Sequence, residues 1–250
     1  LALGYLFVEG WIEQLEDVAS VEVGEDETGT DGAKVSTRSE PDPRCKNIAD
    51  VTPRPGYRPP LDAGQRDTRS TAACGICGKR TIAEAMMLRP PPLTDPSVEL
   101  PWAPSVLARL PDLLRERQEL FHLTGALHAA GLFSSTGELF SLREDIGRHN
   151  AVDKVIGDAF RRGCLPLSAY ALQVSGRVSF EIVQKAHRAG IPLISAVSGV
   201  SSLAVEFAER AGITLIGFVR DGRSTVYTHP QRLSLRGSSS ARSVATRDRS

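Results

Sequence analysis

The chain has 250 residues, enough for one large domain or two small ones, and its apolar (41%) and charged (24%) contents are those of an ordinary globular protein. Thirty basic residues balance thirty acidic ones, so the overall charge gives no indication of nucleic-acid binding. No apolar run approaches the roughly 18 residues needed to span a bilayer, which argues against a membrane protein. Four cysteines are too few for a disulfide scaffold and favour a reducing, cytoplasmic setting.

The first 72 residues divide into two parts. Residues 1–19, LALGYLFVEGWIEQLEDVA, are apolar on one side of a helix and predict a helical N-terminal piece. Residues 20–72 are rich in Gly, Pro, Asp and Arg, and we expect loop or disorder with at most a short strand. Cys45 lies there, and we interpret it as an incidental exposed thiol.

A Cys-x-x-Cys pair opens the main predicted domain, residues 73–232. Cys74 and Cys77 lie among glycines, and Thr81 and Glu84 then form a capping box that predicts a short helix from Ile82. After a proline-rich linker, PDLLRERQELF predicts a helix with Pro111 in its first turn, continuing helically through TGALHAAGLFSS. His128, on that continuation, is expected to be a packing histidine. A strand is predicted in ELFSL, residues 138–142.

From residue 147 onward, helices and strands alternate. Asn150 and Asp153 are expected to cap a helix that contains Val152, Val155 and Ile156. Three apolar strands follow, AYALQVSGR, IPLISAVSG and ITLIGFVRDGR, separated by helices SFEIVQKAHRAG and SSLAVEFAERAG. This order predicts an α/β fold whose parallel or mixed sheet has helices on both faces. The tail, residues 233–250, has almost no apolar residue and is expected to be disordered.

The three strands end in arginine-containing turns. Parallel strands send their carboxyl ends to one edge of the sheet, so Arg177, Arg220 and Arg223 should gather there beside two helix N-termini. That combination suits phosphate groups, which arginine grips in a bidentate manner. Ordinary caps, turns and surface arginines would give the same pattern. A second stretch, REDIGRHNAVDK, is dense in ionisable groups that could line a pocket or form a solvated helix entrance with local ion pairs. These groups are Glu144, Asp145, Arg148, His149, Asp153 and Lys154.

The cysteine pair allows several chemistries. A structural zinc site needs further ligands, and no second Cys-x-x-Cys exists; Cys164 is isolated. A zinc deaminase signature would need His-x-Glu, which is absent, and a thioredoxin-like pair would open a longer helix. A nucleophilic carrier fits better, because Lys79, Arg80 and a helix N-terminus lower a thiol pKa and glycines keep the loop mobile. Such a thiolate can carry sulfur as a persulfide.

Long segments of the chain resemble the formate dehydrogenase accessory sulfurtransferases, the FdhD family. The resemblance rests on CGICGK, FHLTGALHAAGLF, REDIGRHNAVDKVIG, the run from Val174 to Arg223, and VYTHPQR, and covers residues 1–19 and 72–232. It implies a cytidine-deaminase-like fold without the deaminase zinc site. It also implies a cytoplasmic homodimer that takes sulfur from a cysteine desulfurase and serves formate dehydrogenase.

The resemblance also implies roles for particular residues. Cys74 falls on the family's persulfide carrier and Cys77 on its second cysteine. The acceptor is the bis-molybdopterin guanine dinucleotide form of the molybdenum cofactor, bound as a substrate, with no permanently bound metal. The family's cofactor-binding segment falls on Phe218, Val219, Arg220, Asp221, Gly222 and Arg223.

The chain departs from the family pattern in three places. The family has a strand region before Leu1, Ser-x-Pro-Ser-Ser where this chain has Ser198-Gly199-Val200-Ser201-Ser202, and Arg-Phe-Asn-Val-Tyr where it has Arg223-Ser224-Thr225-Val226-Tyr227. Two other functions stay open at this point. They are a chaperone that binds the molybdenum cofactor without carrying sulfur, and a structural zinc-binding domain.

Overall fold

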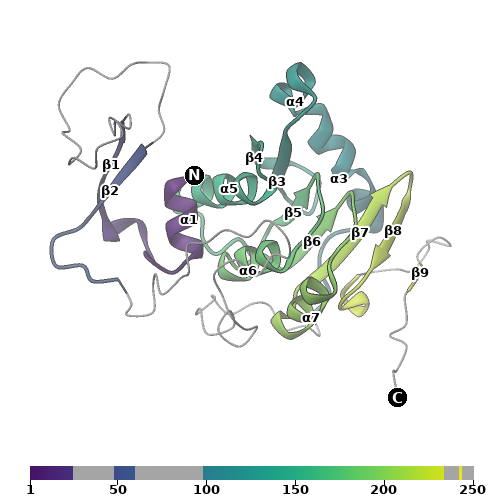
Figure 1. Ribbon diagram of the computed structural model, residues 1–250. Helices are drawn as coiled ribbons and strands as arrows, with labels where there is room; N and C mark the ends of the chain where they lie inside the picture. The colour runs from purple at the N-terminus through teal and green to yellow at the C-terminus, as the bar shows by residue number, and fades with distance from the viewer. Residues whose placement is uncertain (25–47, 60–97, 234–241, 244–250) are drawn as a thin grey trace.

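A computed structural model describes residues 1–24, 48–59, 98–233 and 242–243 (Figure 1). In these residues the chain forms a two-stranded sheet, β1-β2, and a seven-stranded sheet in the order β4-β3-β5-β6-β7-β8-β9. The helices are α1 (Ala2–Val8), η1 (Leu15–Asp17), α3 (Pro104–Glu116), α4 (Glu119–Thr124), α5 (Arg148–Arg161), α6 (Phe180–Arg188), α7 (Ser202–Ala211) and η2 (Pro230–Arg232). The strands are β1 (Val18–Gly24), β2 (Ile48–Pro53), β3 (His128–Phe133), β4 (Leu139–Asp145), β5 (Ala171–Val174), β6 (Leu193–Ala196), β7 (Thr214–Arg220), β8 (Arg223–Val226) and β9 (Arg242–Ser243).

The large sheet is mixed. Strands β5, β6 and β7 run parallel, with Leu172 opposite Ile194 and Ile194 opposite Leu215. Strand β3 is antiparallel to both β4 and β5, and β8 is antiparallel to β7. The predicted strand-helix-strand order from residue 169 to 220 is confirmed, and its parallel core matches the fully buried strands β5 and β6.

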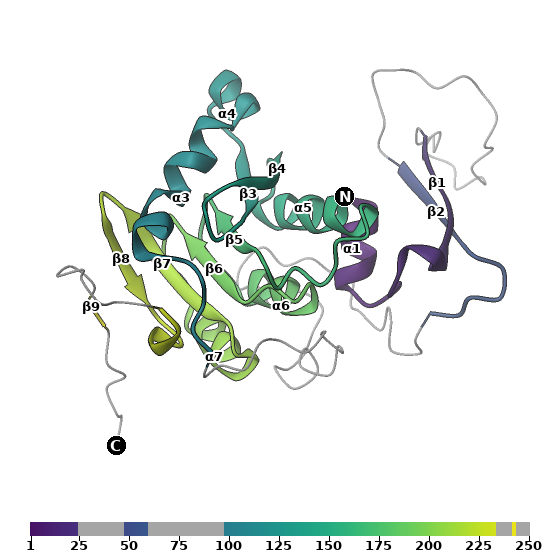
Figure 2. The same ribbon diagram turned by 180° about the vertical axis from the view of Figure 1, so that it is seen from behind.

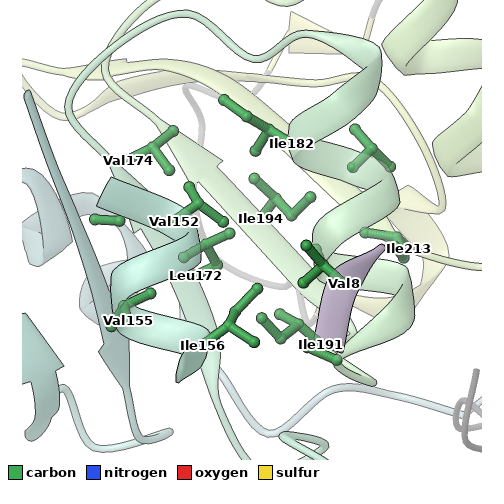
Figure 3. Packing of buried hydrophobic residues seen from close by; sticks show 14 of the residues in the cluster. Val8, Val152, Val155, Ile156, Leu172, Val174, Ile182, Ile191, Ile194 and Ile213 are labelled. Carbon is green, nitrogen blue, oxygen red and sulfur yellow. The ribbon is translucent and has the colours of Figure 1, made fainter. Parts of the chain in front are cut away.

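Helices cover both faces of this sheet, as the sequence predicts. Helices α1, α5, α6 and α7 lie on one face and α3 crosses the other (Figures 1 and 2). Figure 3 shows how Val152 and Ile156 of α5 pack with Leu172 and Ile194 of the sheet and with Val8 of α1. Each such side chain contributes roughly 1.5–3 kcal/mol when it is fully buried, so this layer is the main source of stability.

The N-terminal helix is shorter than predicted. Helix α1 ends at Val8, and Gly10 then adopts a left-handed φ of 79°, which a helix cannot continue through. Asp17 Oδ2 accepts hydrogen bonds from the amides of Glu13 and Gln14 at 2.9 and 3.0 Å, and strand β1 begins directly afterwards. Strand β1 pairs antiparallel with β2, so this part of the chain holds two strands where at most one short strand was expected.

Helix α3 begins earlier than predicted. Pro104, not Pro111, occupies the first turn, where a missing N–H costs nothing. Pro111 lies inside the helix, which normally costs about 3 kcal/mol. The helix persists because Leu107, Leu110 and Leu114 are all buried against the sheet, and together they contribute more than that cost.

The predicted helical continuation through residues 124–135 is wrong. Gly125, with a φ of 68°, ends α4, and His128–Phe133 form strand β3. Strand β3 lies between β4 and β5, so its backbone groups are paired on both sides. The helix preference of two alanines amounts to tenths of a kcal/mol and is overridden by this pairing.

The entrance to helix α5 also differs from the prediction. The helix starts at Arg148, so Asn150 and Asp153 lie inside it instead of capping it. Asp145 Oδ1 stabilises the entrance by accepting hydrogen bonds from Gly147 N at 2.8 Å and Asn150 Nδ2 at 3.1 Å. Asp153 forms a buried ion pair with Lys185 Nζ at 2.6 Å and thereby joins α5 to α6.

Candidate anion-binding site at the carboxyl edge of the sheet

The carboxyl ends of the three parallel strands meet at one edge. Strand β5 ends at Val174 and leads into α6, and β6 ends at Ala196 and leads into α7. The two connecting loops are joined, because Val178 N donates to Gly199 O at 3.1 Å and Ser201 N donates to Val178 O at 3.0 Å. The Ser201 side chain accepts from Ala204 N and caps α7, so the loop has a fixed position.

Strand β7 carries an irregularity where it reaches this edge. The β7–β8 register shifts between Gly217 and Arg220, and Phe218 has a φ of 53°, a left-handed conformation that costs a bulky residue of order 1–3 kcal/mol. Phe218 N donates to Ser198 O at 3.1 Å, and a Cβ on Gly199 would lie 3.0 Å from the Phe218 ring. The glycine therefore lets the half-exposed Phe218 ring lie over the β6–α7 loop.

Residues 220–223 form the tip of the β7–β8 hairpin. Arg220 and Arg223 are opposite each other, and Asp221 and Gly222 between them have φ values of 52° and 68°, as a two-residue hairpin turn of this hand requires. All four residues are exposed. Val219 differs, because it is buried with the core on the α3 side, so a ligand could reach only its backbone.

Arg177 is exposed in the β5–α6 loop, at the same edge. The structure thus brings Arg177 and the 218–223 segment to one edge, as the sequence predicted, with β6 between them. Whether these residues bind a ligand stays a prediction.

His149, from the predicted ionisable stretch, connects two helix N-termini. Its Nε2 lies 2.8 Å from Ser179 Oγ and 3.0 Å from Glu181 Oε2. Burial, followed by the positive charges of Arg148 and Lys185 and by His128, lowers the pKa of His149 to about 4. The imidazole is therefore neutral at pH 7, and it links α5 to the start of α6.

Other residues of that stretch lie elsewhere. Glu144 and Lys154 line a groove of about 1220 Å³ between α1, β1, β4 and α5, away from the carboxyl edge. Glu144 accepts hydrogen bonds from the amides of Leu120 and Phe121 at the start of α4, at 2.9 and 2.8 Å. The Lys154 Nζ atom lies 2.6 Å from Asp145 Oδ2. Glu144 and Lys154 thus line a groove and also make local polar contacts, so the structure does not decide between the two interpretations.

Of the four cysteines, the structure describes Cys164. Cys45, Cys74 and Cys77 lie outside the described residues, as do Lys79, Arg80 and the helix predicted from Ile82. Cys164 is half-buried, and its thiol lies 3.5 Å from Arg162 O. Over residues 1–24, 48–59, 98–233 and 242–243, no group of three His, Cys, Asp or Glu side chains is arranged to hold a metal ion. Within the same ranges, no helix has the length and apolar character needed to cross a membrane.

Comparison with known proteins gives matches along almost the entire chain. The sequence profile of the FdhD/NarQ family matches residues 1–234. The chain belongs to this family. The family match also includes residues 20–72, which the resemblance described above left out.

Family members with similar sequences occur in several bacteria. The chain is 43% identical to a protein of Streptomyces coelicolor over 237 residues, covering 94% of this chain and 79% of that protein. It is 44% identical to a protein of Mycobacterium tuberculosis over 234 residues, covering 93% of this chain and 81% of that one. Both proteins are named sulfur carrier protein FdhD.

A solved structure shares the fold. It is the crystal structure of a putative formate dehydrogenase accessory protein from Desulfotalea psychrophila, with a TM-score of 0.63 and 24% identity, covering 92% of this chain and 77% of that chain. The predicted mixed α/β architecture is therefore shared with that protein. The cytidine-deaminase-like label stays a prediction.

Proposed function

We propose that this protein is a sulfur carrier in the maturation of formate dehydrogenase. Cys74 takes sulfur from a cysteine desulfurase as a persulfide and delivers it to the bis-molybdopterin guanine dinucleotide cofactor. The proposal rests mainly on relatives that are 43–44% identical over 93–94% of the chain and are named sulfur carriers. The Cys74-Gly-Ile-Cys77 sequence supplies the thiols that such a role needs.

The sulfur transfer uses ordinary thiol exchange. The Cys74 thiolate attacks the outer sulfur of the desulfurase persulfide; that S–S bond breaks, the desulfurase cysteine leaves as a thiolate, and a new S–S bond forms on Cys74. Attack by the Cys77 thiolate on the inner sulfur then releases the outer sulfur as hydrosulfide for the cofactor. The resulting Cys74–Cys77 disulfide is reduced by a cellular dithiol before the next cycle.

The carboxyl edge is the proposed binding surface for the cofactor's guanine dinucleotide. Arg220 and Arg223 are exposed on the β7–β8 hairpin and have the charge and fork geometry that diphosphates require. Phe218, 41% exposed beside them, offers an aromatic face to a guanine base.

Mass spectrometry tests the carrier role. After incubation with a cysteine desulfurase and cysteine, the peptide containing Cys74 and Cys77 should gain about 32 Da, the mass of one sulfur atom. The Cys74→Ala variant should lose this gain, whereas the matched Cys164→Ala variant should keep it. An unchanged gain in Cys74→Ala would reject Cys74 as the carrier.

Calorimetry with guanosine diphosphate tests the binding surface. The Arg220→Ala/Arg223→Ala double variant should bind at least about tenfold more weakly, because each charged hydrogen bond contributes roughly 1.5–3 kcal/mol. Arg210→Ala, an exposed arginine on α7 that pairs with Glu206, is the control. If formate dehydrogenase maturation needs the two hairpin arginines but tolerates replacement of both cysteines, the chaperone hypothesis replaces the carrier.

A further inference from the structure

A second group of positive charges lies at the carboxyl edge, on the β3–β5 side. We define the Arg148–Arg177 cluster as the side chains of Arg148, Arg177 and His128 together with the backbone of Gly176. His128 begins β3, Gly176 follows β5, and Arg148 begins α5. The sequence alone could not join these residues, because His128 and Gly176 meet only through the antiparallel pairing of β3 with β5.

The contacts in this cluster are close. A Cβ on Gly176 would lie 3.2 Å from His128 Nδ1 and 3.8 Å from Arg148 Cδ, so the imidazole and the arginine both pack against the glycine backbone. The pKa of His128 is lowered, first by burial and then by the charges of Arg148 and Arg177. Both guanidinium groups therefore lie within electrostatic range of the same ring.

Neither Arg148 nor Arg177 forms an ion pair with a carboxylate in the part of the chain that the structure describes. Asp145, close in sequence, pairs with Lys154, and Glu181 lies 3.0 Å from His149 Nε2. The Nε of Arg148 is buried and has no hydrogen-bond partner among the described residues. Leaving such a donor unpaired costs about 1–3 kcal/mol.

The position on the helices makes the arrangement less favourable still. Arg148 is the first residue of α5, and Arg177 lies two residues before the N-cap of α6. The positive end of a helix dipole is at its N-terminus, so a cation there is disfavoured by roughly 0.3–1 kcal/mol. Stability of the fold does not account for two arginines at these positions, but binding of an anion does.

We propose that the Arg148–Arg177 cluster binds a phosphate-class oxyanion, at a site distinct from the β7–β8 hairpin. Strand β6 lies between β5 and β7, so the two sites lie on opposite sides of β6. Two such sites match a ligand with two diphosphate arms. This last assignment, to the second arm of the guanine dinucleotide cofactor, rests on the proposed function; the anion site itself does not.

Pyrophosphate is the probe for the cluster. Calorimetry at low ionic strength should show pyrophosphate binding to the Arg220→Ala/Arg223→Ala protein, in which the hairpin site is disabled. Adding Arg177→Gln or Arg148→Gln should weaken that binding at least about tenfold. Arg148→Lys should lose less, because it keeps the charge but not the fork. Arg210→Gln is the matched control and should change nothing.

A spectroscopic measurement reports on the same site. The pKa of His128, followed by NMR, should rise when pyrophosphate binds, because an anion offsets the charges of Arg148 and Arg177. Unchanged affinity in both single-arginine variants, absence of binding to the hairpin variant, or an unchanged His128 pKa would overturn the proposal. Arg177 is exposed, so its variant tests the site even if Arg148→Gln fails to fold.

The test is separate from that of the proposed function. Persulfide loading of Cys74 does not require the cluster, so Arg177→Gln should still gain one sulfur atom. Loss of pyrophosphate binding with normal loading supports the site. Normal loading with normal pyrophosphate binding rejects the site and leaves the carrier role standing.

Discussion

The two ends of helix α5 hold arginines in opposite surroundings. At its carboxyl end, the buried Asp158 carboxylate is contacted by Arg143 at 2.8 Å, Arg162 at 2.8 Å and Arg161 at 3.5 Å, and by the Ser141 hydroxyl at 2.8 Å. At its amino end, Arg148 has a buried Nε without a partner in the described residues.

The difference separates charges that have a counter-charge in the fold from charges that form no ion pair within the described residues. Cations at the carboxyl end of a helix complement its dipole, and here they also satisfy a buried carboxylate. Cations at the amino end oppose the dipole, and Arg148 adds to the positive charge around His128 and His149. The first group should therefore matter for stability, and the second should matter mainly for binding.

The largest effect on stability is expected at the carboxyl end of α5, where Asp158 pairs with arginines. Asp158→Asn should lower the free energy of unfolding at pH 7 by about 1.5–3 kcal/mol, because it removes charged hydrogen bonds at a buried position. Urea unfolding measures this. Glu206→Gln, which breaks the exposed pair with Arg210, is the control and should cost about 0.3–0.5 kcal/mol. Equal losses in the two variants would contradict the comparison.

The stability that the Asp158 carboxylate contributes should depend on pH. Burial alone would raise the pKa of Asp158, but the Ser141 hydrogen bond and the charges of Arg143 and Arg162 lower it below its ordinary value of 3.8. The stability it contributes is therefore present above pH 3.8 and is lost as the pH falls through the folded-state pKa. The difference between Asp158→Asn and the parent protein should shrink in that range.

A smaller effect on stability is expected from His149 at the amino end of α5. Its pKa is about 4 in the folded protein against an ordinary value of 6.5, so the unfolded chain binds more protons between these values. Stability from this group is complete above pH 6.5 and falls as the pH drops toward 4. NMR titration measures the pKa, and His149→Gln should flatten the stability profile between pH 6.5 and 4. A measured pKa near 6.5 would contradict the burial of this ring and the action of the neighbouring charges on it.

The smallest effect on stability is expected from Arg148. Arg148→Ala should not lower the free energy of unfolding, because no ion pair in the described residues is lost and a buried donor without a partner there is removed. Thermal and urea unfolding beside Asp158→Asn give the comparison directly. A loss as large as that of Asp158→Asn would mean that Arg148 has a structural partner and would break the contrast between the two ends.

Much of the second half of the fold could be predicted because its signals are local. Strands β5 and β6 are buried and largely apolar, and Ser201 and Gly212 mark the start and end of α7 as expected. Strand β3 was missed because its alanines favour a helix locally, and only pairing on both sides makes it a strand. The start of α3 was missed because three buried leucines outweigh the internal Pro111.

Some features of the candidate site could be predicted from the sequence, and others could not. The order of strands and helices placed Arg177, Arg220 and Arg223 at one edge, since parallel strands end together. It did not reveal that Val219 is buried, because the shifted register at Phe218 determines which way that residue faces. Nor did it reveal the contact of His128 and Arg148 with Gly176.

By itself, the amino-acid sequence determined the family, the alternation of strands and helices after residue 147, and the gathering of arginines at the carboxyl edge, since each depends on residues close together in the chain. Only the tertiary structure decided which charges are paired. Asp158 meets Arg143 through the packing of β4 on α5, and the pairing of β3 with β5 places His128 beside Arg148, whose Nε has no partner among the described residues. Whether an arginine meets a carboxylate depends on the distance between residues that are far apart in the sequence. That distance is fixed only when non-local strands pair.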